Sequence, residues 1–371
     1  MRVPFLDLKR MDSELKSALK SKFSEMLDEG VFSGGKEVKS LESKVSTYLS
    51  SPFSIACANG TDALELALRA LQIGSGDEVI VPAMTWVSTA EAVVMVGAEP
   101  IFWDTDANGL LAADWEEAIT GKTKAVMPVH LYGKMVDMEN LMAKAKKHKL
   151  FVIEDGAQSF GSFQKKKAAG TFGDVGCLSF YPTKNLGALG EAGMCLTDSP
   201  ELNGRIRRLL NHGQKARDEH ELVGRNSRID AIQAGFLAVF MDRFASFQEL
   251  RKRFAGMYLK ELADREELRL PAGILEEDHN AHLFVVQTPK RNELKEFLSK
   301  QGVGTAIHYP HSLPEMRGFA CAGNFENAGK LSRQGLSLPL NPWMRGEDIV
   351  FVCAKIREFF HTSDRSGREV F

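Results

Sequence analysis

A lysine and an aspartate indicate the chemistry that this sequence could perform. Lys184 ends the segment 179–184, and a glycine-containing stretch, 185–190, follows it. Asp155 comes directly after the apolar run 150–153 and Glu154. A desolvated lysine amine can hold an aldehyde as a Schiff base, and a carboxylate can pair with a pyridinium nitrogen. Lys184 and Asp155 together therefore predict pyridoxal phosphate as the cofactor, whereas either residue alone would be weak evidence.

Each of these residues also has a simpler interpretation. Most lysines are solvated surface groups, but an apolar run and the rigid Tyr181-Pro182 pair precede Lys184, and glycines follow it. Asp155 could equally be a helix cap or one half of a salt bridge. A carboxylate at the end of a buried strand needs a partner in any case, because burying it bare is costly.

Two further segments could contact a cofactor. Residues 59–63 follow a predicted strand and open a predicted helix, where free amides beside Gly60 would form an anion site. An ordinary strand–helix turn is the more common reading of such a segment. Trp86 comes shortly after Pro82 and could stack on a planar ring. On its own, Trp86 is more simply read as a core residue.

The elements that must position these residues alternate along the chain. Short apolar runs predict strands, and helical patterns separate them, beginning with the leucines at 64, 68 and 71. Continuous apolar strands alternating with helices favour a mostly parallel sheet that is covered on both faces. Ligands bind beyond the carboxyl ends of such strands, where Asp155 is expected. The predicted strands are 53–57, 79–81, 100–103, 124–127 and 151–153.

A second region is predicted after a long helical connector, 229–263. Beyond Pro271 the alternation resumes, and 371 residues are long for a single core. We therefore expect a large cofactor-binding domain with N-terminal helices over 1–245 and a smaller C-terminal α/β domain over 246–371. The elements predicted for this second domain are a strand at 282–286, a helix at 291–300, a strand at 303–308 and a helix at 348–360.

Composition narrows the class of protein. The net charge is −2, from 47 basic and 49 acidic residues, which gives no support to a nucleic-acid or membrane partner. The five cysteines form no CxxC pair, and Pro310 separates His308 from His311, so we expect no metal site. There is no signal-peptide pattern and no apolar run near the roughly 20 residues that span a bilayer. We expect a cytoplasmic protein.

Seven segments, in this order, resemble the DegT/DnrJ/StrS family of sugar aminotransferases, which use pyridoxal phosphate on the fold-type-I scaffold. The resemblance covers nearly the whole chain and implies an α/β fold of that type. Two small departures are Gly156, where many relatives have alanine, and 191–193, where many have a glycine pair. The matching segments are 59–64, 76–82, 128–133, 154–158, 180–185, 226–230 and 308–310.

The resemblance implies a role for each matching residue. Lys184 would hold the cofactor and move protons, and Asp155 would keep the pyridine nitrogen protonated. Asn226 would reach the phosphate of a neighbouring subunit, which implies a homodimer with shared active sites. The remaining cofactor contacts would be Gly60, Thr61 and Ser179 at the phosphate, Trp86 over the ring and Gln158 near the ring hydroxyl. Tyr181, His308 and Tyr309 would line the sugar pocket. Apart from the resemblance, residues 224–230 combine a polar loop with a helix start, so Arg228 could reach a phosphate or a substrate carboxylate, or the segment could simply be a charged helix cap.

The implied activity is transfer of an amino group, with L-glutamate as donor, to a nucleotide-linked keto sugar. Residues 3–8 and 308–310 resemble members that aminate carbon 3 of deoxythymidine-linked hexoses. Amination at carbon 4 or of an inosose remains an alternative. A related dehydratase is expected to lack the lysine, and a non-catalytic regulator would not need the Lys184 and Asp155 pair. A nicotinamide oxidoreductase is disfavoured because no GxGxxG follows the first strand.

Overall fold

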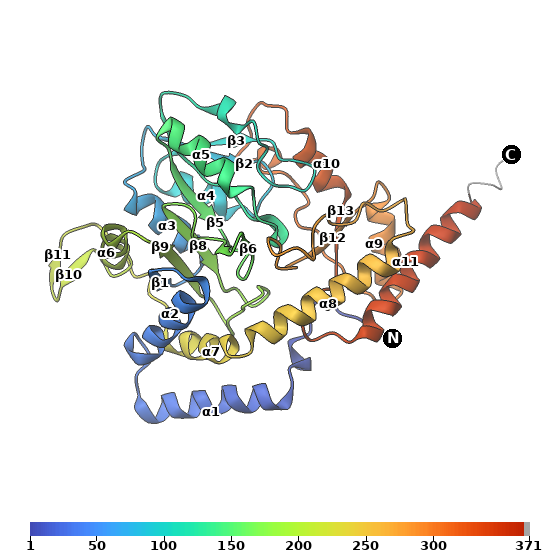
Figure 1. Ribbon diagram of the computed structural model, residues 1–371, viewed down its shortest axis with the longest axis horizontal. Helices are drawn as coiled ribbons and strands as arrows, with labels where there is room; N and C mark the ends of the chain where they lie inside the picture. Colours follow the sequence, from blue (N-terminus) through green and yellow to red (C-terminus); the bar gives the residue numbers. More distant parts are fainter. Residues whose placement is uncertain (367–371) are drawn as a thin grey trace.

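A seven-stranded sheet forms the centre of the computed structural model, which describes residues 1–366 (Figure 1). The strand order is β1-β9-β8-β5-β4-β2-β3, and β9 alone runs antiparallel to its neighbours. The predicted mostly parallel sheet is therefore confirmed. Its strands are β1 (Phe53–Cys57), β2 (Glu78–Pro82), β3 (Glu99–Trp103), β4 (Thr123–Val126), β5 (Phe151–Asp155), β8 (Val175–Ser179) and β9 (Gly193–Thr197).

Helices cover both faces of this sheet, and alternate side chains of one strand show how. Cys177 of β8 packs in the hydrophobic cluster that contains the apolar residues of α3 (Gly60–Ala70). Its neighbour Leu178 packs in a different cluster, with residues of α2 (Gly35–Leu49) and α7 (Ala231–Met241). Successive strand side chains point to opposite faces, so α3 lies on one face and α2 with α7 on the other.

The remaining helices are α1 (Ser13–Glu29), α4 (Ser88–Met95), α5 (Met138–His148), α6 (Pro200–Leu209), α8 (Phe244–Leu262), α9 (Arg291–Lys300), α10 (Glu326–Gln334) and α11 (Gly346–Ser366), with the 3-10 turns η1 (Leu8–Arg10), η2 (Trp115–Ala118), η3 (Leu131–Gly133) and η4 (Leu313–Glu315). Figure 1 shows α8 running from the end of α7 to the region of α9 and α11. Within residues 1–366, no helix is long and apolar enough to cross a bilayer.

Short two-stranded pairs complete the fold, and they correct one prediction. The segment 303–308 is not a strand, because Val303 bridges to Val3 while Ala306 bridges to Ser337, so no continuous partner exists. The strand predicted at 282–286 is β12 (Phe284–Gln287), and it pairs with β13 (Gly335–Leu338), a strand that was not predicted. The pairs are β6 (Phe163–Gln164) with β7 (Lys167–Ala168), β10 (Gln214–Ala216) with β11 (Glu219–His220), and β12 (Phe284–Gln287) with β13 (Gly335–Leu338).

Two helical predictions also need correction. The single connector predicted for 229–263 is two helices, because α7 ends at Met241 and α8 begins at Phe244. The helical pattern expected before β4 is only the short turn η2. A separate hydrophobic cluster joins α8, α9, α11, β12 and β13. The boundary between residues 245 and 246 falls just inside α8 and stays a prediction, and residues 367–371 of the second domain lie outside the described residues.

Candidate active site

Asp155 lies at the carboxyl end of β5, where a parallel sheet binds its ligands. Its side chain is buried but not bare. Oδ2 accepts a hydrogen bond from Thr89 Oγ1 at 2.7 Å, and Oδ1 accepts one from the Ala157 amide at 3.1 Å. The Thr85 and Thr89 hydroxyls are 3.0 Å apart, which orients the Thr89 donor. The fold therefore holds this carboxylate in place while two oxygens retain further acceptor capacity.

Glu154 precedes Asp155 on β5 and points to the opposite side of the strand. It is fully buried, and its oxygens accept hydrogen bonds from the amides of Gly170, Phe172 and Gly173 at 2.6–2.8 Å. His130 Nε2 is 3.0 Å from Glu154 Oε2, and the Val136 amide donates to His130 Nδ1. Nε2 thus carries the ring proton and donates a hydrogen bond to Glu154 Oε2.

The two adjacent carboxylates consequently have different roles. Four protein donors occupy Glu154, so it stabilises the loop after β5. Asp155 is the carboxylate that remains available for a ligand. The sequence did not show which of the two carboxylates would stay available for a ligand. Successive side chains of a strand point to opposite faces, however, so Glu154 and Asp155 had to lie in different surroundings.

Lys184 lies on the loop between β8 and β9, and its backbone amide donates to the Tyr181 carbonyl at 2.8 Å. Burial lowers the pKa of the amine to about 8, while the Asp155 carboxylate opposes that change. Within residues 1–366, the amine forms neither a hydrogen bond nor an ion pair with another side chain. A lysine with a pKa near 8 is substantially neutral at mildly alkaline pH, so it can act as a nucleophile.

The start of α3 and the end of β8 form a close-packed cradle. The Asn59 side chain caps α3 by accepting from the Asp62 amide at 2.8 Å. A Cβ on Gly60 would lie 2.7 Å from the Ser179 Cβ, so only glycine fits there without displacement. The Thr61 and Ser88 hydroxyls are 2.7 Å apart. Free helix amides beside hydroxyl groups suit a phosphate, and the residues present therefore fit that part of the predicted cofactor.

Gln158 connects the end of β5 to the C-terminal half of the chain. Its Oε1 accepts from the Tyr132 amide at 2.6 Å, and its Nε2 donates to Tyr309 Oη at 3.0 Å. The Tyr309 ring lies 5.4 Å from the Trp86 ring. Trp86 is 55% exposed, so a large part of its indole is open to a ligand and it is not the core residue that its type alone suggests.

His308 and Tyr309, which are predicted for the sugar pocket, carry no charge at neutral pH. Burial and the Lys184 charge lower the pKa of His308 to about 4, and its Nδ1 is 2.8 Å from Ser337 Oγ. Burial and the Asp155 charge raise the pKa of Tyr309 far above its usual range. Tyr181 is 47% exposed and lies between Ser179 and Lys184 along the chain.

Asn226 and Arg228 lie on a different segment from the residues above. The Ala58 amide donates to the Ser227 carbonyl at 2.8 Å, which places this segment beside the turn before α3. Asn226 is exposed, and Arg228 Nη1 donates to Asn211 Oδ1. In the part of the chain that the structure describes, neither side chain contacts Lys184. Their predicted roles toward a partner subunit and a substrate stay predictions.

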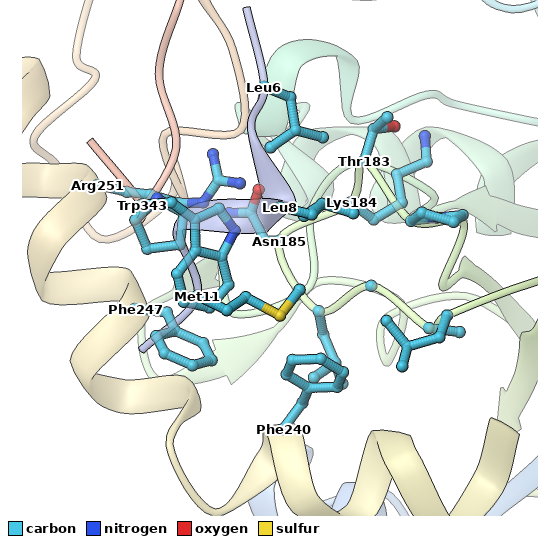
Figure 2. Close-up of a pocket in the computed structure, with 16 residues that line it drawn as sticks. Leu6, Leu8, Met11, Thr183, Lys184, Asn185, Phe240, Phe247, Arg251 and Trp343 are labelled. Carbon is cyan, nitrogen blue, oxygen red and sulfur yellow. The ribbon is translucent and has the colours of Figure 1, made fainter. Parts of the chain in front are cut away.

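A cavity lies on the other side of the lysine loop (Figure 2). Apolar side chains line most of it, including those of Met11, Phe240, Phe247 and Trp343. In Figure 2 the Lys184 amine points away from these aromatic rings. This cavity is therefore separate from the cradle and from Asp155.

Comparison with known proteins places the chain in a family. Residues 13–357 match the model of the DegT/DnrJ/EryC1/StrS aminotransferase family. The chain is 40% identical to UDP-N-acetyl-3-dehydro-alpha-D-glucosamine 3-aminotransferase of Acidithiobacillus ferrooxidans, over 97% of this chain and 98% of that protein. It is 37% identical to dTDP-3-amino-3,4,6-trideoxy-alpha-D-glucose transaminase of Streptomyces venezuelae, over 98% of this chain and 98% of that protein.

A solved structure agrees with these sequence matches. The crystal structure of S. venezuelae DesV, in complex with a ketimine intermediate, superimposes with a TM-score of 0.93 at 37% identity, covering 96% of this chain and 98% of that one. The fold-type-I prediction is thereby confirmed, as is pyridoxal phosphate, the cofactor of this family. The chain belongs to the DegT/DnrJ/EryC1/StrS aminotransferase family.

Proposed function

We propose that this aminotransferase converts the carbon-3 ketone of a nucleotide-linked keto-deoxyhexose to an amine, with L-glutamate as the amino donor. The names of two relatives, a 3-dehydro sugar 3-aminotransferase and a 3-amino sugar transaminase, support the sugar class and the carbon. The observation that carries the proposal is the half-buried Lys184 amine, which has no hydrogen-bond or ion-pair partner among the described side chains and lies within the electrostatic influence of Asp155. A regulator would not need this arrangement.

When bound, pyridoxal phosphate supplies an electrophilic carbonyl carbon and an electron sink for the reacting substrate. Asp155 would hold the proton on the pyridine nitrogen, and Thr89 would keep the carboxylate oriented for that task. Lys184 Nζ would carry a proton between the substrate carbon that bears the nitrogen and the cofactor carbon on the other side of that nitrogen. An amine with a pKa of about 8 can do both near neutral pH, because neither protonation state is strongly disfavoured.

The cradle would bind the cofactor phosphate through Gly60, Thr61 and Ser179. Both ends of the Gln158 amide form hydrogen bonds, which hold the side chain in one orientation, and from there it would lie near the ring hydroxyl. Trp86 would cover one face of the ring with its exposed indole. These contacts orient the cofactor without adding a charge to the site.

Neutral side chains are suited to recognise the hydroxyl groups of a sugar. His308 and Tyr309 stay uncharged at neutral pH and can donate or accept hydrogen bonds. Tyr181 adds a half-exposed ring on the lysine side. Arg228 would supply positive charge for a substrate phosphate or carboxylate from the neighbouring segment.

We also propose a homodimer with shared active sites and two domains that divide near residue 245. Asn226 is exposed, so it is free to reach a phosphate bound by a partner subunit. The separate hydrophobic cluster around α8, α9 and α11 supports the division into domains. Amination at carbon 4, or of an inosose, remains the alternative to carbon 3.

Product analysis tests the proposal. The purified protein, loaded with pyridoxal phosphate, is incubated with L-glutamate and either a 3-keto or a 4-keto nucleotide hexose, and the products are identified by mass spectrometry and NMR. We expect 2-oxoglutarate and a 3-amino sugar. An amine at carbon 4, or turnover of an inosose alone, would contradict the proposed substrate while leaving the aminotransferase chemistry intact.

A further inference from the structure

The segment 279–283 passes through the site, and none of the roles above involves it. Asn280 Nδ2 donates to the carbonyls of Gln158 and Phe160 at 2.9 and 3.0 Å. Its backbone amide donates to the Gly133 carbonyl at 3.1 Å. This segment therefore lies against the loop that carries Gln158, although it follows that loop by more than a hundred residues.

The same segment also holds the residue after Lys184. Asn185 Nδ2 donates to the Asn280 carbonyl at 2.9 Å and to Gln248 Oε1 at 2.8 Å. Asn185 Oδ1 lies 2.9 Å from His282 Nδ1. Because both amide hydrogens of Asn185 are used, its oxygen must accept, and His282 Nδ1 must carry the ring proton. The tautomer of His282 thus follows from the contacts of its partner.

His282 is fixed at its backbone as well as at its ring. Its amide donates to Asn280 Oδ1 at 2.9 Å, and its carbonyl accepts from Arg251 Nη1 at 3.2 Å. Figure 2 shows Arg251 reaching from α8 toward the loop of Asn185 and Lys184. Ala281, between Asn280 and His282, has a φ of 52°. A left-handed alanine is strained, so the surrounding contacts must impose this conformation.

The titratable groups around the Lys184 amine come from different parts of the chain. Asp155 approaches it from β5, and both His282 and His308 approach it from the C-terminal half. Burial, then the Lys184 charge, lowers the pKa of His282 well below its usual range. Arg251 acts on His282 in the same direction. His282 is therefore neutral and adds no positive charge beside the amine.

We propose that His282 is a positioning residue for Lys184, because its Nδ1 proton orients the Asn185 side chain and Asn185 anchors the loop that presents the lysine. The inference rests on the proposed function of Lys184 as the cofactor lysine. Its alternative is a core histidine that only stabilises the fold.

Two substitutions separate these roles. His282→Phe keeps the ring volume and removes the donor, whereas His282→Asn keeps a donor near the Nδ1 position. Tyr258→Phe is the matched control, since it removes one buried hydrogen bond, to the Pro339 carbonyl at 2.9 Å, away from the lysine loop. Cofactor-free protein is mixed with pyridoxal phosphate, and the absorbance of the lysine-bound cofactor is followed over time. The rate at which this absorbance appears is measured between pH 6 and about 10, a range that extends close to the ordinary pKa of lysine. Thermal unfolding without cofactor reports stability.

We expect His282→Phe to capture the cofactor about tenfold more slowly at pH 8, the effect of losing one hydrogen bond of about 1.4 kcal/mol. Its pH midpoint should rise above that of the wild-type protein, because a looser loop lets water reach the amine. His282→Asn and Tyr258→Phe should keep the wild-type rate and midpoint. If His282→Phe does not fold, Asn185→Asp is the replacement, because it keeps the acceptor for His282 and loses the two donor bonds; it should then keep the pH midpoint closer to the wild-type value than Asn185→Ala, which loses all three contacts.

The inference is overturned if His282→Phe, with its fold intact, captures the cofactor at the wild-type rate and midpoint. It is equally overturned if His282→Asn is as slow as His282→Phe, because the Nδ1 donor would then not be the relevant group. A wild-type protein that never captures the cofactor contradicts the proposed function of Lys184 instead.

Discussion

Gly60→Ala should disrupt cofactor binding through one steric contact. The added Cβ would lie 2.7 Å from the Ser179 Cβ, 3.1 Å from its Oγ and 3.3 Å from its Cα. Ordinary carbon contacts are about 3.5–4.0 Å, so the start of α3 and the end of β8 must separate by about 1 Å. Overpacking of this kind costs about 1–3 kcal/mol. Because we propose that the same amides and hydroxyl bind the cofactor phosphate, we expect affinity for pyridoxal phosphate to fall about tenfold or more.

The chain offers a matched control and a rescue for this prediction. Gly204 lies within α6, and a Cβ there meets nothing within 4 Å, so Gly204→Ala should leave binding unchanged and raise helix stability by about 0.5–1 kcal/mol. In the double variant Gly60→Ala with Ser179→Gly, the contacts with the Ser179 Cβ and Oγ are removed while the 3.3 Å contact with the Cα remains, so stability should partly recover. Equilibrium titration with pyridoxal phosphate and thermal unfolding of the cofactor-free protein measure both effects. Wild-type affinity and stability in Gly60→Ala would refute the cradle.

Three further predictions concern other parts of the site. Glu154→Gln should lower the free energy of unfolding by about 3 kcal/mol, since it places a donor among four donors; an unchanged denaturation midpoint would contradict the structural role of Glu154. Asn226→Ala should weaken cofactor retention during dialysis without lowering the thermal stability of the cofactor-free protein; unaltered retention would argue against a phosphate contact across subunits. The rate of cofactor capture should rise with pH through about 8, because the neutral amine reacts; a midpoint near the ordinary lysine value of about 10.4 would contradict the burial of Lys184.

Much of the fold could be predicted because its signals are local. Short apolar runs predicted β1, β2, β3, β4 and β5, and α9 has the same bounds as the helix expected at 291–300, whereas β8 and β9 were not predicted. The strand at 303–308 was wrong because pairing is not a local property. Val303 and Ala306 each meet a different distant residue, and β13 becomes the partner of β12 instead.

The site shows the same division between local and distant information. Lys184 and Asp155 could be proposed from their positions at the ends of apolar runs. The sequence alone could not show that the Glu154 carboxylate accepts hydrogen bonds from the loop at 170–173, or that Thr89 donates a hydrogen bond to the Asp155 carboxylate. His282 was read only as part of a predicted strand. A polar residue inside an apolar run was its one visible signal, whereas its link to Asn185 spans nearly a hundred residues.

The covalent bond between Lys184 and the cofactor is the central claim, and borohydride reduction tests it most directly. The protein loaded with pyridoxal phosphate is reduced, digested and analysed by mass spectrometry, with Lys184→Ala treated in parallel. We expect the pyridoxyl group on the peptide that contains Lys184 and no stoichiometric label in the variant. Stoichiometric labelling of another lysine, or equal labelling of the Lys184→Ala protein, would contradict the account.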